Sequence, residues 1–207
     1  MKKNESHVSG EAALLSGKPE VLQLEERRAS QEQYFFTEDT IERLVPLCEG
    51  RTACLCTPTV AEAAVRKGNE VTLFDIDPRF KELFGEDVFV PYDLYRGLHS
   101  LHQENADSLT PEYEYSFDTV IVDPPFSGVT PARLAQNINA LLKWDLEGDT
   151  YAYIVYPRSG GEALEEAFED LGMVGQVRED IPIDHVNTPK GYDTGRKEIV
   201  LFQFRRV

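Results

Sequence analysis

Short apolar runs alternate with segments of helical character, and this alternation constrains the fold more than any other feature of the chain. Runs of four to eight apolar residues are typical of strands that are buried on both faces of a sheet. Between two of them, Leu134, Ile138 and Leu141 recur at helical spacing. The alternation predicts an α/β fold, a doubly wound and mostly parallel sheet of seven strands with helices on both faces. The runs cover 52–57, 71–74, 87–90, 117–122, 151–156, 173–178 and 198–204.

Local signals mark the ends of several helices. Pro46 is expected to stop the first helix, because proline removes a backbone donor and clashes with the preceding turn. Thr130 is a capping residue and Pro131 occupies the first helical position of a later helix. Gly172 is expected just beyond the end of the last one. The expected helices cover 37–45, 60–66, 130–142 and 162–171.

The first thirty residues differ from the rest of the chain. Residues 1–30 are polar and rich in Glu, Ser and Lys, with weak periodicity, which is typical of an extension. Residues 31–207 carry all of the apolar runs. We therefore expect one α/β domain over 31–207, preceded by a polar N-terminal extension over 1–30.

Composition and charge exclude several classes of protein. No window reaches the roughly 18 apolar residues of a membrane span, and no apolar stretch of signal-peptide type is present at the start. We expect a cytoplasmic, nuclear or nucleolar protein, neither secreted nor bound to a membrane. The net charge of −16 opposes broad binding of nucleic acid, although residues 187–207 are net basic.

The three cysteines do not indicate a metal site. Cys54 and Cys56 lie two apart in an apparent strand, where we expect them to share one face, and Cys48 stands alone. The chain contains no CxxC pair. We therefore expect buried free thiols and no bound metal.

Ligands of doubly wound sheets bind beyond the carboxyl ends of the strands, and polar residues follow several of the apolar runs. Asp75 ends the second run, where a carboxylate suits the two hydroxyls of a ribose; the alternative is an acid that caps the next turn. Asp77 is a weaker candidate, because Asp-Pro is ordinary turn chemistry. Asp93 follows the third run, as a ligand of an adenine amino group or as a surface turn. The first run ends in Thr57-Pro58 without GxGxxG, which disfavours an NAD or FAD dehydrogenase.

The segment Asp123-Pro124-Pro125-Phe126 after the fourth run carries the strongest chemical signal. Two consecutive prolines fix the backbone and remove two N–H donors. The carboxylate and a neighbouring carbonyl then offer two acceptors to one –NH₂ group, and Phe126 offers a ring for stacking. Such positioning suits methylation of a weakly nucleophilic amine. A rigid turn is the alternative.

Two further segments are candidates for substrate binding. Tyr34, Phe35 and Phe36 precede the sheet, either above the ligand pocket or as core packing. Arg196 and Lys197 lie just before the last run, either in contact with phosphate or in a solvated loop.

These motifs resemble those of a known family. Asp123-Pro124-Pro125-Phe126 is similar to motif IV of the amino methyltransferases, [DNS]-P-P-[YFW]. The segments 33–37, 73–80 and 194–197 resemble, in the same order, segments of the probable N6-adenine methyltransferases. One branch of that family is a zinc-knuckle ribosomal-RNA N6-adenosine methyltransferase, and the other is a lysine methyltransferase of a translation elongation factor. The likeness spans roughly residues 31–205 and is nearer to the first branch.

The resemblance implies a Rossmann-like class I methyltransferase that uses S-adenosyl-L-methionine. By this likeness Asp75 binds the cofactor ribose, Asp93 its adenine and Thr57-Pro58 its methionine side. Asp77 and Asp123 also face the cofactor. Asp123 and the Pro124 carbonyl hold the target amine, and Phe126 stacks on the base. The chain departs from the first branch in having no cysteines for a zinc-binding module.

Three functions remain open on these grounds. The first is methylation of adenine N6 in RNA, with ribosomal RNA favoured and with a partner protein to compensate for the acidic charge. The second is methylation of a lysine in a translation factor, whose basic surface the acidic chain would suit. The third is a non-catalytic binding subunit of the same fold, which the loop without glycine after the first run favours.

Overall fold

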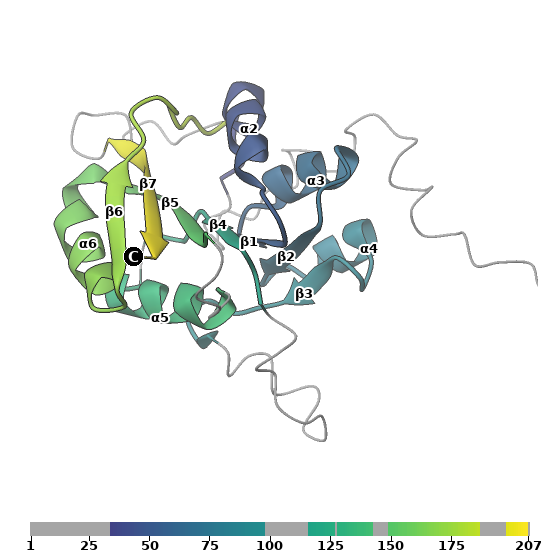
Figure 1. Ribbon diagram of the computed structural model, residues 1–207. Coiled ribbons are helices and arrows are strands. Elements are labelled where there is room, and N and C mark those ends of the chain that lie inside the picture. The colour runs from purple at the N-terminus through teal and green to yellow at the C-terminus, as the bar shows by residue number, and fades with distance from the viewer. Residues whose placement is uncertain (1–33, 98–115, 127, 143–148, 187–197, 207) are drawn as a thin grey trace, which may run out of the picture.

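The structure is a computed structural model that describes residues 34–97, 116–126, 128–142, 149–186 and 198–206. Its centre is one seven-stranded sheet in the order β3-β2-β1-β4-β5-β7-β6 (Figure 1). The strand β7 is antiparallel to both of its neighbours, and the other described pairings are parallel. The predicted seven-stranded, mostly parallel sheet is confirmed. The strands are β1 (Thr52–Leu55), β2 (Val71–Asp75), β3 (Phe89–Pro91), β4 (Thr119–Val122), β5 (Tyr151–Pro157), β6 (Met173–Val177) and β7 (Ile199–Arg206).

Helices cover both faces of the sheet, as the alternation predicted. In Figure 1, α2, α3 and α4 lie on one side and α5 and α6 on the other. Short 3-10 turns follow α2 and β5. The helical elements are α2 (Glu38–Leu44), η3 (Val45–Leu47), α3 (Pro58–Arg66), α4 (Arg79–Phe84), α5 (Pro131–Leu141), η6 (Arg158–Gly160) and α6 (Gly161–Glu169).

The helix ends follow the local chemistry closely, with one correction. Thr37 and Thr130 cap α2 and α5 through their side-chain oxygens. The α-helix α2 ends at Leu44, before Pro46 as the sequence predicted, and the chain continues through Pro46 as the 3-10 turn η3. The helix α3 begins at Pro58, and not at Val60 as expected, because proline suits the first helical position.

The helix α4 was not expected from the sequence. Asp-Pro-Arg was interpreted as a turn, yet the Asp77 carboxylate accepts a hydrogen bond from the Arg79 backbone N–H at 3.1 Å. That contact supports the first turn of α4. Phe80 and Phe84 then bury their rings against the sheet, at a ring separation of 6.3 Å.

The apolar core has one part on each face of the sheet. Ala53 and Leu55 pack with α5 and α6, whereas Cys54 packs with α2, α3 and α4. The prediction that Cys54 and Cys56 share a face is wrong. β1 ends at Leu55, and Cys56 turns into the left-handed region at φ 54°, where it packs against the opposite part of the core.

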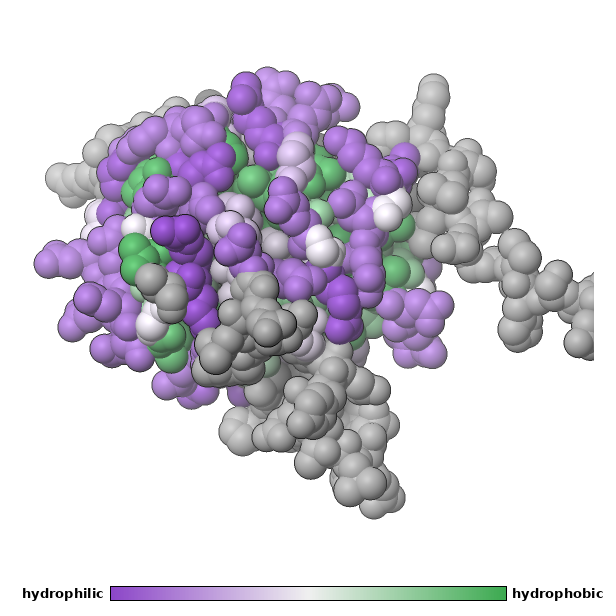
Figure 2. All heavy atoms as spheres, viewed as in Figure 1, coloured by the Kyte–Doolittle hydropathy of each residue, from purple (hydrophilic) through white to green (hydrophobic). Residues whose placement is uncertain are grey.

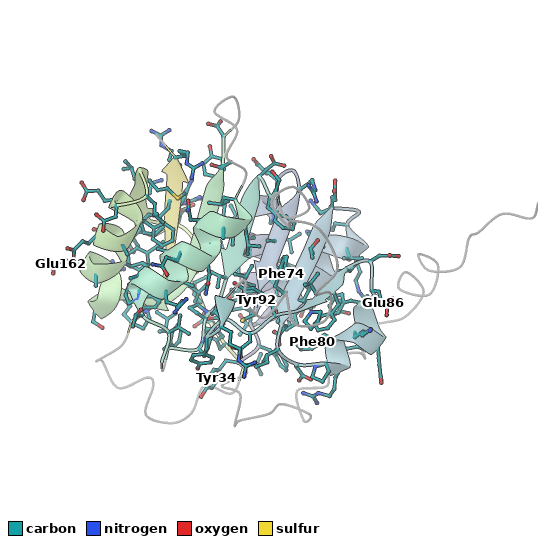
Figure 3. The ribbon with its side chains drawn as sticks, turned by 90° about the horizontal axis from the view of Figure 1, so that it is seen from below. Tyr34, Phe74, Phe80, Glu86, Tyr92 and Glu162 are labelled. Carbon is teal, nitrogen blue, oxygen red and sulfur yellow. The ribbon has the colours of Figure 1, made fainter. Side chains whose placement is uncertain are left out.

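An aromatic cluster fills the core beneath the centre of the sheet. Phe74 contacts Tyr92 and Phe117 edge to face, with both ring separations 5.6 Å. Figure 3 shows Phe74 and Tyr92 side by side. These contacts tie the ends of β2 and β3 to the segment that enters β4, so that the strand ends are fixed relative to one another.

The surface agrees with the acidic composition. The face seen in Figure 2 is mostly hydrophilic, with scattered apolar side chains. In the described part of the chain, no helix has the length and apolar character that a membrane crossing requires.

Candidate active site

The carboxyl ends of the central strands meet at one edge of the sheet. Cys56 donates its backbone N–H to the Phe74 carbonyl at 2.9 Å, and Asp123 donates its own to the Leu55 carbonyl at 3.2 Å. These bonds continue the parallel ladders one residue beyond each strand. They bring Cys56, Asp75 and Asp123 to the same level of the sheet.

Cys56 lies at the centre of this edge. Burial raises the pKa of its thiol, and three nearby carboxylates raise it further. The carboxylates are those of Asp75, Asp123 and Asp93. Three of the four acidic residues that the sequence singled out thus lie around Cys56, and the fourth, Asp77, contacts Asp75 through its backbone N–H.

Asp75 is buried at the end of β2, with 5% of its surface exposed. Its Oδ1 accepts a hydrogen bond from the Asp77 backbone N–H at 2.9 Å. Burial raises the pKa of this carboxyl to about 7. The Asp77 carboxylate adds to the shift, and backbone N–H donors and Arg79 oppose it only in part. A buried carboxylate with unused acceptor capacity fits the two hydroxyls of a cofactor ribose.

The side chain that follows Asp75 also fits a cofactor. Among the described residues, Ile76 is one of three large apolar side chains that are exposed, at 49%. An apolar surface beside a ribose-binding acid suits the face of an adenine ring. Ile76 was not among the candidates from the sequence, although it directly follows the strand-end acid Asp75.

Asp77 and Asp93 have local partners. Asp77 is fully buried, and its two oxygens accept hydrogen bonds from the Arg79 guanidinium at 2.6–3.0 Å. Asp93 accepts from the Tyr95 backbone N–H at 2.9 Å and pairs with Arg96 at 3.4 Å. Both residues thus shape turns at the edge of the site, and a direct contact of either with the cofactor stays a prediction.

Thr57 and Pro58 begin α3 at the same edge. Thr57 is 1% exposed, and its hydroxyl has no hydrogen-bond partner among the described residues. Pro58 occupies the first turn of the helix, where its missing N–H leaves no donor unsatisfied. Asp75 and Ile76 form a mixed polar and apolar pair that fits the ribose and adenine of S-adenosylmethionine, and a contact of Thr57 or Pro58 with its methionine side stays a prediction.

Asp123-Pro124-Pro125-Phe126 follows β4 directly. Burial raises the pKa of the Asp123 carboxyl, and the neighbouring His185 lowers it in part. Pro124 is buried, and the Phe126 ring meets Tyr156 edge to face at 6.1 Å. Phe126 is half-buried, so that part of its surface is accessible for stacking.

His185 is a second candidate site residue that sequence reasoning missed. Its Nε2 lies 2.8 Å from Asp123 Oδ2, and both side chains are nearly buried. The residues are 62 positions apart, and in the sequence His185 was one of four scattered histidines. Its local sequence, Ile183-Asp184-His185-Val186, contains no motif that would single it out.

The aromatic segment 34–36 lies against His185 and the core. Phe35 and Phe36 are 4% exposed, and Tyr34 is half-buried. The two phenylalanines therefore pack in the core, and their part in substrate binding stays a prediction.

Arg196 and Lys197 lie outside the described residues, as does the extension 1–30. The described residues contain no cluster of His, Cys, Asp and Glu side chains suited to a metal ion.

Solved structures share this fold. A branched-chain polyamine synthase mutein from Thermus thermophilus, in complex with N4-aminopropylspermidine and 5′-methylthioadenosine, is 13% identical with a TM-score of 0.61. The match covers 87% of this chain and 58% of the synthase, so the chain spans less than two thirds of that protein. A TehB-like SAM-dependent methyltransferase from Corynebacterium glutamicum is 17% identical with a TM-score of 0.51, over 81% of this chain and 88% of the other.

Sequence comparison gives the family. No curated protein matches the chain. The family model described as probable N6-adenine methyltransferase matches residues 27–182, most of the 207-residue chain. The chain therefore belongs to the probable N6-adenine methyltransferases, and this membership confirms the resemblance and the cofactor S-adenosylmethionine that the sequence predicted.

Proposed function

We propose that this methyltransferase modifies N6 of an adenine in RNA, with structured ribosomal RNA as the favoured acceptor. The observation that supports the proposal is the position of Asp123-Pro124-Pro125-Phe126 at the end of β4, level with the buried Asp75. Amine-binding and ribose-binding groups then lie at one edge of the sheet. The family description agrees with adenine as the acceptor.

Asp123 and its neighbours orient the amine. S-adenosylmethionine supplies a methyl group on a positively charged sulfur. An Asp123 oxygen and the Pro124 carbonyl accept the two N–H groups, which directs the nitrogen lone pair towards that methyl group. Phe126 stacks on the base, which must first leave its stack in the RNA. After the nitrogen has gained the methyl group, the proton that it loses passes to Asp123.

The charge of the chain bears on how RNA is held. A net charge of −16 opposes contact with a polyanion. We therefore propose that a basic partner protein supplies part of the RNA affinity. The salt dependence of RNA binding would then be steep in the complex and shallow for the isolated chain.

A labelling experiment tests the proposal. The purified chain is incubated with tritiated S-adenosylmethionine and with total RNA, DNA or protein extract, and labelled RNA is digested to nucleosides. We expect label in N6-methyladenosine, its loss in Asp123→Ala, and its retention in Asp87→Ala, which changes an exposed acid in the turn before β3. Label found in protein alone would contradict RNA as the acceptor.

A lysine of a translation factor is the second candidate. The observation that favours it is the buried Asp123–His185 pair, because a lysine ammonium must lose a proton before it can attack. The acidic chain also suits a basic protein surface. Label confined to one protein band, with methyllysine after hydrolysis, would select this function. Cofactor binding without label in any extract would indicate a non-catalytic subunit instead.

A further inference from the structure

Asp123 and His185 form a close contact between two nearly buried side chains. The Nε2–Oδ2 distance is 2.8 Å, and the two side chains are 9% and 8% exposed. A hydrogen bond of this length to an ionised carboxylate is a strong one. A carboxylate has two oxygens, so the bond to Oδ2 leaves Oδ1 as an acceptor.

The backbone around His185 is held by the segment that precedes α2. His185 and Phe36 form an antiparallel bridge. Val186 donates to the Phe35 carbonyl at 2.7 Å, and Thr37 donates to the Asp184 carbonyl at 2.9 Å. Because these bonds lie on both sides of His185, the position of its ring relative to Asp123 is fixed by two segments far apart in the sequence.

Aromatic rings enclose the imidazole. The centroids of the Phe36 and His185 rings are 4.8 Å apart, and the planes of the two rings meet at 30°. The Tyr34 ring meets the imidazole edge to face, with the centroids 6.3 Å apart. Such rings exclude water from the pair and strengthen the electrostatic interaction inside it. Among the described residues, the Cys56 thiol interacts electrostatically with Asp123, and the Tyr34 phenol ring lies beside the imidazole.

A purely structural role explains this pair poorly. Burying a charged or polar pair is often no more stabilising than apolar residues of the same size. Perturbed carboxyl groups with one specific partner concentrate at functional sites. Asp123 also stands at the first position of the amine-binding segment.

We propose that His185 is a positioning residue for Asp123. It holds Oδ2, directs Oδ1 towards the acceptor amine and keeps the carboxylate ionised, so that Asp123 can take the proton that the methylated nitrogen releases. This inference rests on the proposed role of Asp123 in binding an amine. It holds for an adenine and for a lysine acceptor.

The pH dependence of kcat separates this role from a structural one. His185 lowers the pKa of Asp123, so its removal raises that pKa and displaces the acidic limb of the rate profile to higher pH. His185→Phe keeps an aromatic ring beside Phe36 but donates no hydrogen bond. We expect its kcat to fall more at pH 6.5 than at pH 9, by up to about tenfold for each pH unit by which the acidic limb is displaced. His185→Gln restores a donor and should recover part of kcat, with the limb still displaced.

A matched control perturbs the same segment without touching the pair. Ile183 is buried two residues before His185, and Ile183→Ala should lower activity by the same factor at every pH. KM for the cofactor should be unchanged in His185→Phe and His185→Gln. A loss that is equal at pH 6.5 and pH 9 in both His185 variants would overturn the proposal.

A measurement without substrate keeps the inference separate from the proposed function. The ¹⁵N signals of the His185 ring, assigned with His185→Gln, are compared between the native protein and Asp123→Asn. Changed ring signals support the pair whatever the acceptor proves to be, and unchanged signals overturn it. If the acceptor is a protein lysine, RNA methylation fails as a function while the rate profile on that acceptor still tests His185.

Discussion

The Asp75 carboxyl makes cofactor binding depend on pH in a way that can be measured. Its pKa is raised to about 7 because it is buried, with Asp77 as a second carboxylate nearby. A ribose donates two hydroxyl hydrogens and therefore binds the ionised form. These hydrogen bonds favour the charged carboxylate, so binding lowers the pKa of Asp75 and releases a proton.

The size of the effect follows from that pKa. Roughly one tenth of the Asp75 carboxyls are ionised at pH 6 and roughly nine tenths at pH 8. Affinity for the cofactor should therefore rise about tenfold between these two pH values, which is about 1.4 kcal/mol. Below pH 6, the affinity should continue to fall about tenfold for each pH unit while the bound carboxylate stays ionised.

Isothermal titration calorimetry with S-adenosylhomocysteine tests this, in buffers of differing ionisation enthalpy that report the released proton. 5′-Methylthioadenosine serves as a second ligand, because it has the ribose but no titrating amino-acid group. Asp75→Asn should bind more weakly and lose the pH dependence, whereas Asp87→Asn should retain it. Equal affinity at pH 6 and pH 8 in the native protein, or the same slope in Asp75→Asn, would refute the reasoning.

Three predictions concern stability, each measured by urea unfolding of the ligand-free chain. The folded-state pKa of Asp75 is raised above 3.8, so its stabilising contribution is complete below pH 3.8 and is lost as the pH rises through about 7. Asp75→Asn should therefore stabilise the chain at pH 8, by up to about 4 kcal/mol, with no gain near pH 4; an equal gain at both would contradict this. Cys56→Gly should stabilise by about 1 kcal/mol by relieving the left-handed backbone at φ 54°, and a loss of stability would show that the thiol packing outweighs the strain. Phe168→Ala should cost about 3–5 kcal/mol, because its fully buried ring stacks on Phe204 at 4.1 Å; a change below about 1 kcal/mol would mean that this part of the core can collapse into the gap.

The fold could be predicted from the sequence because its signals are local. Each strand is an apolar run, and helix ends such as Thr130-Pro131 carry their own capping chemistry. The edge of the sheet that carries the site could also be predicted, because ligands of parallel sheets bind beyond the carboxyl ends of the strands. That rule placed Asp75 and Asp123 together without any distance information. The helix α4 was missed because its six residues are too few for a periodic signal.

The partners of the site residues could not be predicted, because they depend on contacts between distant segments. The bridge between Phe36 and His185 joins irregular backbone, where neither a period of two nor one of 3.6 applies. The place of Cys56 depended on where β1 ends, and a one-residue change there reverses the face of a side chain. Asp77 looked like a ligand from its place in the sequence, yet Arg79 two residues later occupies its oxygens.

Asp75 and Asp123 lie in the same site but have different neighbours, and the difference separates two chemical roles. Burial raises the pKa of both carboxyls. Backbone N–H donors oppose the raised pKa of Asp75 only in part, so this carboxyl titrates near neutral pH. The hydroxyls of a ligand then complete its hydrogen bonds. Asp123 has the imidazole of His185, which favours its ionised form before any acceptor arrives. The pH dependence of cofactor binding should therefore follow Asp75 and that of kcat should follow Asp123. A change at His185 should then displace the second without the first, because the imidazole Nε2 lies 2.8 Å from Asp123 Oδ2.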